Sequence, residues 1–65
     1  MMLANDELRV VLAGEAAGRD ALEKGIDLTT QAGLLEYATV VALAQARARA
    51  TNELRNAEQA AEDAS

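Results

Sequence analysis

The chain has 65 residues, of which 16 are alanine and nine are leucine, and its formal net charge is −5. It contains no histidine, cysteine, proline, tryptophan or phenylalanine. These absences exclude disulfide staples, metal sites built on histidine or cysteine, and most pairs of a nucleophile with its base. We therefore expect no enzymatic activity, no metal site and no cofactor.

A chain of this length forms one domain at most, and it buries only about 60% of its unfolded surface when it folds alone. Ordering costs roughly 1.5 kcal/mol per residue, which apolar burial only just offsets in so small a domain. Small domains therefore gain additional stability from disulfides, bound metals or partner chains. Because this chain has no cysteine or histidine, we expect partner chains to stabilise it. We expect a homo-oligomer and favour a dimer.

The acidic balance argues against nucleic acid as a partner. No positively charged start leads into an apolar segment, and the longest uncharged run, 37–46, is far shorter than a membrane span of about 20 residues. These features predict a cytoplasmic protein without membrane contact. Five of the six basic residues are arginine, which together with the many alanines favours a GC-rich bacterial or phage genome.

The first predicted element is a helix over about 6–24. Asn5 is a suitable N-cap, and Asp6 and Glu7 place negative charge in the first turn, where the helix dipole favours it. Gly25 is a typical left-handed residue after a helix C-terminus. The chain is therefore expected to turn over 25–27.

The second predicted element is a longer helix over about 28–60, capped by Asp27 or by one of the two following threonines. Gly33 falls in the first turns of this helix, where glycine lowers helix stability by about 1 kcal/mol relative to alanine. The last residues, 61–65, are expected to fray, because two acidic side chains there oppose the negative end of the helix dipole. Residues 1–65 are thus predicted to form a single all-α helical hairpin whose second helix overhangs the first.

The second helix changes character along its length. Over 28–46 apolar residues occur on every side, and a helix that is apolar all round is buried all round. One short antiparallel helix cannot cover both faces, so we expect a second copy to complete a dimeric four-helix bundle. Beyond residue 46 the apolar positions narrow to a heptad-like, alanine-rich seam. The expected self-interface or core residues are Leu8, Val11, Leu12, Leu22, Leu28, Leu34, Leu35, Tyr37, Val41, Ala42, Leu43 and Leu54.

The first helix carries two contrasting sides. Its leucine stripe includes Glu15 and Arg19, whose i, i+4 spacing favours an ion pair at a helix–helix boundary, with partner recognition as the alternative. The opposite side holds small residues, among them Gly14 and Gly18, which favour close packing of a neighbouring helix. Tyr37 is the only aromatic residue and is expected at the self-interface or in the core.

Arg47, Arg49 and Arg55 are the only basic cluster, and they are further candidates for partner contacts. Because successive residues of a helix rotate by about 100°, the three point in different directions. The interpretation we favour is a non-enzymatic helical interaction module that acts as a homo-oligomer on a protein partner. The alternatives are a small RNA-binding regulator, similar only in size and topology to regulators of plasmid copy number, and an acidic phage-type inhibitor that mimics nucleic acid.

Overall fold

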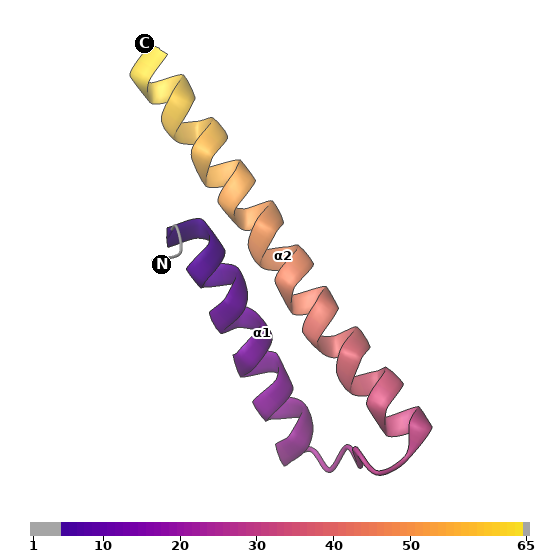
Figure 1. Cartoon of the computed structure of the whole chain (residues 1–65). Coiled ribbons are helices and arrows are strands. Elements are labelled where there is room, and N and C mark those ends of the chain that lie inside the picture. The colour runs from indigo at the N-terminus through magenta and orange to yellow at the C-terminus, as the bar shows by residue number, and fades with distance from the viewer. Residues whose placement is uncertain (1–4, 65) are drawn as a thin grey trace.

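The computed structural model describes residues 5–64, which form two antiparallel helices joined by a turn (Figure 1). Helix α1 spans Asn5–Glu23 and helix α2 spans Gln31–Ala64. At 1.5 Å per residue their lengths are about 28 and 51 Å. Helix α2 therefore extends far past the start of α1 (Figure 1), as expected. The all-α hairpin is confirmed for the described residues.

Helix α1 ends in a Schellman motif. Gly25 has a φ of 98°, in the left-handed region that favours glycine. The Ile26 amide donates to the Ala21 carbonyl at 3.2 Å, and the Gly25 amide donates to the Leu22 carbonyl at 3.1 Å. These two bonds satisfy carbonyls that the helix end leaves open. The predicted role of Gly25 is confirmed.

Helix α2 begins three residues later than predicted. The Thr30 hydroxyl accepts a hydrogen bond from the Gly33 amide at 3.0 Å, so Thr30 is the N-cap. The Asp27 carboxylate instead accepts bonds from the Thr29 amide at 2.9 Å and the Thr29 hydroxyl at 2.6 Å. Leu28 therefore lies in the turn, and the expected helix start at 28 is wrong because the turn forms its own hydrogen bonds.

Gly33 is explained by the turn that packs against it. A Cβ atom at this position would collide with the backbone carbonyl oxygen of Asp27. The same carbonyl accepts a hydrogen bond from the Thr30 hydroxyl at 3.0 Å, which holds the turn against the first residues of α2. Only glycine leaves room for this close approach.

The carboxyl end of α2 remains helical to Ala64. The expected helix end at about residue 60 is therefore too early. Ser65 lies outside the described residues, and the fraying of 61–65 in solution stays a prediction.

The two helices meet through the small-residue side of α1, whose buried residues are Val10, Gly14, Gly18 and Ala21. Added Cβ atoms would lie 2.7 Å from Nε2 of Gln45 at Gly14 and 2.6 Å from the hydroxyl oxygen of Tyr37 at Gly18. The two glycines thus admit side chains of α2, which confirms their predicted role in close packing. The buried hydrophobic core is small, with Val10 8% exposed and Ala21 3% exposed.

A polar contact fixes the open end of the hairpin. Asn52 is 6% exposed, and its Nδ2 donates to the Asp6 carbonyl at 2.9 Å. Asn56 Nδ2 donates to the Asp6 carboxylate at the same distance. Together with the contact between Tyr37 and Gly18 near the turn, these bonds fix which residues of α1 and α2 lie at the same level.

Candidate interaction surface

The leucine side of α1 does not pack against α2. Leu8, Val11, Leu12 and Leu22 are all exposed, with Leu12 at 53%. These residues are therefore not part of the core of the single chain, because the glycine side of α1 allows a closer approach to α2 than a row of leucines would. Their predicted place in a self-interface stays a prediction. The signal that marks the packed side is the i, i+4 spacing of Val10, Gly14 and Gly18, followed by Ala21.

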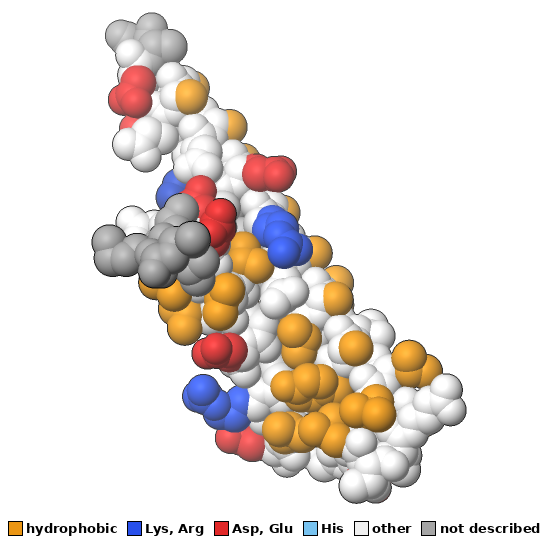
Figure 2. All heavy atoms as spheres, viewed as in Figure 1, with side chains coloured by type: hydrophobic (Ala, Val, Ile, Leu, Met, Phe, Trp, Pro, Cys, Tyr) orange, Lys and Arg blue, Asp and Glu red, His pale blue; other side chains and the backbone are white. Residues whose placement is uncertain are grey.

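Helix α2 and the turn also expose large apolar side chains. Leu35 and Leu54 are 63% and 62% exposed, while Tyr37 and Val41 are half-buried. Figure 2 shows hydrophobic side chains gathered at the turn end of the hairpin and continuing along α2. Other predicted self-interface residues that are exposed in the single chain are Leu28, Leu34, Ala42 and Leu43.

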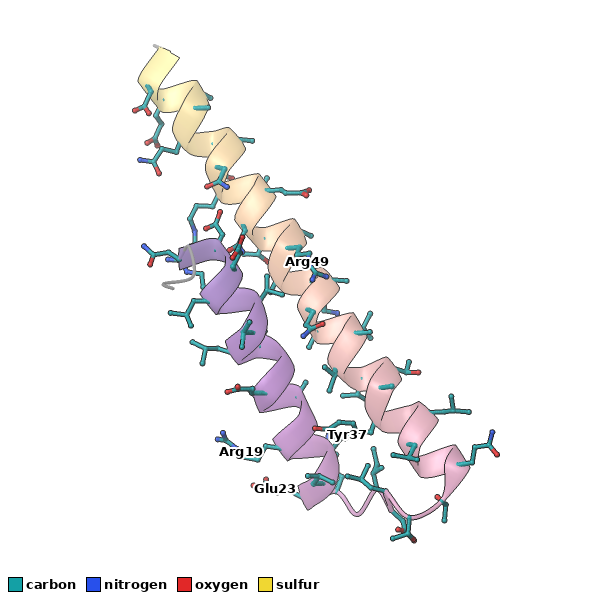
Figure 3. The ribbon with its side chains drawn as sticks, in the orientation of Figure 1. Arg19, Glu23, Tyr37 and Arg49 are labelled. Carbon is teal, nitrogen blue, oxygen red and sulfur yellow. The ribbon has the colours of Figure 1, made fainter. Side chains whose placement is uncertain are left out.

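The charged pair predicted within the leucine stripe of α1 is not an ion pair. Glu15 and Arg19 are both exposed, and Figure 3 shows Arg19 on the side of α1 away from α2. Within residues 5–64 the salt bridge with a measured distance joins Lys24 to Asp20, at 2.9 Å and in an exposed position. The expected place of these two residues at a helix–helix boundary with a partner stays a prediction, because the boundary between α1 and α2 lies on another side of α1.

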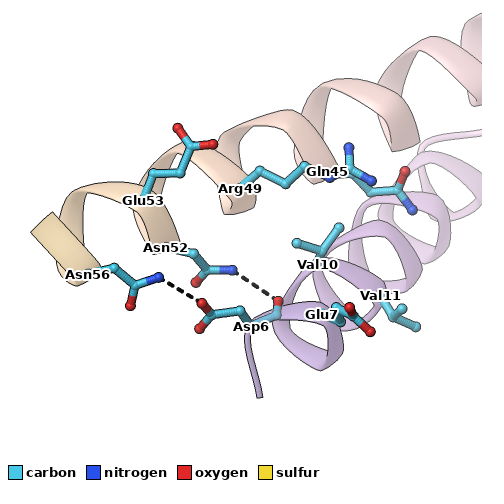
Figure 4. A pocket seen from close by; sticks show the side chains of 9 residues that line it. All are labelled: Asp6, Glu7, Val10, Val11, Gln45, Arg49, Asn52, Glu53 and Asn56. Carbon is cyan, nitrogen blue, oxygen red and sulfur yellow. Dashed lines mark hydrogen bonds between the residues drawn. The ribbon is translucent and has the colours of Figure 1, made fainter. Parts of the chain in front are cut away.

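A hollow of about 390 Å³ lies between the start of α1 and the middle of α2 (Figure 4). The hydrogen bonds from Asn52 and Asn56 to Asp6 form one wall of it. Sequence reasoning missed both asparagines, since their partner is 46 to 50 residues away and no local pattern marks the contact. The hollow is lined by Asp6, Glu7, Val10, Val11, Gln45, Arg49, Asn52, Glu53 and Asn56.

The three arginines of the basic cluster are exposed and do not share a site. Arg49 lines the hollow at the open end of the hairpin, whereas Arg47 and Arg55 do not. Three carboxylates line the same hollow as Arg49, so its surroundings carry excess negative charge. This arrangement gives a phosphate group no cluster of cations to bind.

A second hollow, of about 540 Å³, lies beside the turn. Its lining includes Asp20 and Lys24, which form the exposed ion pair, and Asp27, which lies in the turn. The side-chain hydrogen bond from the Thr29 hydroxyl, followed by the bond from the Thr29 amide, holds the pKa of Asp27 below its ordinary value of 3.8. Asp27 and Thr29 are thus bonded to each other within the turn.

The described residues contain neither a metal-binding cluster nor a membrane-spanning helix. Among them no three side chains of the metal-binding types come together where they could hold an ion. Neither helix in this part of the chain has an apolar stretch long enough to span a membrane. The main feature of the described surface is therefore its exposed leucines.

Comparison with protein-family models, with curated proteins and with solved structures finds no match for this chain.

Proposed function

We propose that the chain is a non-enzymatic helical interaction module that acts as a homo-oligomer, most simply as a dimeric four-helix bundle. The observation that carries this proposal is the number of large apolar side chains left uncovered. Nine leucine and valine side chains are between 37% and 63% exposed, whereas the buried hydrophobic residues are Val10 and Ala21. A surface of this kind is typical of a protein–protein contact.

The total exposed area supports the same proposal. The chain exposes 5129 Å², whereas a folded monomer of 6.8 kDa is expected to expose roughly 4,000 Å². The excess of roughly 1,100 Å² is comparable to the area of about 800 Å² that each partner buries in a standard interface. One further copy of the chain is therefore large enough to cover the excess.

The proposed role after assembly is to bind another protein, as an adaptor, regulator or inhibitor. The oligomer would present the charged sides of the hairpin and the part of α2 beyond α1. The two alternatives draw less support: the arginines needed for RNA point apart, and acidic side chains needed to mimic nucleic acid are spread around both helices.

Sedimentation velocity at micromolar concentration tests the self-association. We expect a dimer for the wild-type chain, and dissociation for Leu12→Asp, because Leu12 is exposed in the single chain and a partner copy would bury the new charge without a counter-ion. Gln59→Asp adds the same charge on the exposed overhang of α2 and is the matched control, with wild-type mass expected. A folded wild-type monomer would contradict the proposal.

A further inference from the structure

The leucine stripe of α1 is nearly symmetric about its midpoint. We define the α1 stripe as Leu8, Val11, Leu12, Glu15, Arg19 and Leu22, all of which are exposed. About a midpoint at residue 17, Leu12 mirrors Leu22 and Glu15 mirrors Arg19. Leu8 mirrors Ile26, which is half-buried in the turn. Three of the four reflections thus match, with two apolar pairs and one pair of an acid with a base. Val11 is the exception, because it reflects onto Glu23.

We infer that the occupant of the α1 stripe is the α1 stripe of a second copy, which runs antiparallel to it. A two-fold interface is isologous, so that residue i meets residue j while j meets i. With the axis at residue 17, each Glu15 meets the Arg19 of the other copy and each Leu12 meets the other Leu22. This inference rests on the proposed self-association and adds its face, direction and register.

The electrostatics favour this register. Within one chain Glu15 and Arg19 are exposed and do not form a salt bridge, so both charges are available to a second copy. The antiparallel arrangement forms two equivalent ion pairs at the centre of the interface and flanks them with leucines. In a parallel α1–α1 pairing with equal residues side by side, Glu15 would face Glu15 and Arg19 would face Arg19, which like-charge repulsion disfavours.

The geometry of the hairpin predicts the distance between the two overhanging ends of α2 in this register. Tyr37 lies over Gly18, and Asn52 bonds to Asp6, so residue 17 of α1 lies level with about residue 40 of α2. Antiparallel docking about this level sends the two overhanging ends of α2 in opposite directions. At 1.5 Å per residue, the two copies of Gln59 are then about 57 Å apart along the bundle.

Charge reversal tests the pairing. Glu15→Arg alone and Arg19→Glu alone each create two like-charge contacts, and each is expected to raise the dimer Kd at least about tenfold. An equimolar mixture of these two variants restores both ion pairs and is expected to form a heterodimer. The double variant E15R/R19E keeps the net charge and the complementarity, so its Kd is expected to stay near that of the wild type.

A matched control separates specific pairing from general charge attraction. Arg9→Glu gives the same net charge as Arg19→Glu but alters an exposed residue outside the α1 stripe. Mixed with E15R, it is expected to form no preferred heterodimer. Sedimentation equilibrium of the single variants, with native mass spectrometry of the mixtures, measures these outcomes.

Spin labels on Gln59→Cys give an independent readout, because the chain has no other cysteine. A separation near 57 Å supports the antiparallel register, whereas one below about 30 Å indicates parallel copies with neighbouring α2 helices. A dimer with the short distance, or one unaffected by both single reversals, would overturn this register and leave self-association standing. A wild-type monomer would overturn the proposed function and this inference with it.

Discussion

The Tyr37 side chain of α2 occupies the space that a side chain at Gly18 of α1 would need. Figure 3 shows Tyr37 pointing from α2 toward α1. A Cβ atom at position 18 would lie 2.6 Å from the Tyr37 hydroxyl oxygen and 3.0 Å from Cζ of the ring. Because the ring is rigid beyond two torsions, it cannot yield without moving away from α1. This contact explains why the glycine side of α1, and not its leucine side, faces α2.

Gly18→Ala is therefore expected to destabilise the fold by about 1–2 kcal/mol, since overpacking outweighs the gain of up to about 1 kcal/mol in helix propensity. Gly14→Ala is the control, because its neighbour is the flexible end of Gln45, and it is expected to be neutral or stabilising. Urea unfolding followed by circular dichroism at one protein concentration measures both. Equal effects of the two substitutions would contradict the account.

Gly33→Ala is expected to cost more than Gly18→Ala, because the obstacle is the backbone carbonyl of Asp27 and not a side chain. Relief of the collision requires the turn to move and breaks the bond from the Thr30 hydroxyl to that carbonyl. The expected result is a loss of about 2–3 kcal/mol, measured by the same urea unfolding. A stabilised G33A variant would show that the turn does not pack on α2 in solution.

Asn52 is expected to contribute through its hydrogen bond to the Asp6 carbonyl. Asn52→Ala removes a buried donor and should cost about 1–2 kcal/mol, while Asn52→Asp should cost more, because a carboxylate cannot donate and lies close to Asp6. Asn56→Ala removes an exposed bond and is the matched control, with an effect below about 0.5 kcal/mol. Amide hydrogen exchange in the first turn of α1 provides a local readout; unchanged protection in N52A would argue against the contact.

Asp27 gives the turn a dependence on pH. Its pKa is held below 3.8 by the Thr29 hydroxyl and amide, so its stabilising effect is present above pH 3.8 and is lost as the pH falls through the lowered pKa. Asp27→Asn keeps an oxygen that accepts these bonds but does not titrate. The stability advantage of the wild type over D27N is therefore expected to shrink between pH 5.5 and pH 2.5; a constant difference would exclude this role for Asp27.

Local signals in the sequence predict much of the hairpin. The absence of proline predicts long helices, and Gly25 predicts where the first helix ends. The structure has the left-handed glycine at position 25 and two helices of unequal length. The sequence does not decide which residue is the N-cap of α2, because Asp27, Thr29 and Thr30 are all residue types that favour this position. Only the fit of the turn against Gly33 selects Thr30.

The packed side of α1 was harder to predict. Hydrophobicity favours the leucine stripe as the side of α1 that packs against α2. The close approach of α2 instead depends on the absence of side chains at Gly14 and Gly18. The bond between Asn52 and Asp6 joins residues 46 positions apart, which no local pattern encodes. We propose that a second copy covers the leucine stripe, which is exposed in the single chain.

We propose that the hairpin depends on a second copy for its stability. Thermal unfolding of the wild-type chain at protein concentrations from 1 to 100 µM, with sedimentation equilibrium under the same conditions, measures this dependence. We expect a dimer mass and a Tm that rises by several degrees for each tenfold increase in concentration, because dimerisation stabilises the folded state by mass action. A cooperatively folded monomer with the same Tm at every concentration would rule out this dependence.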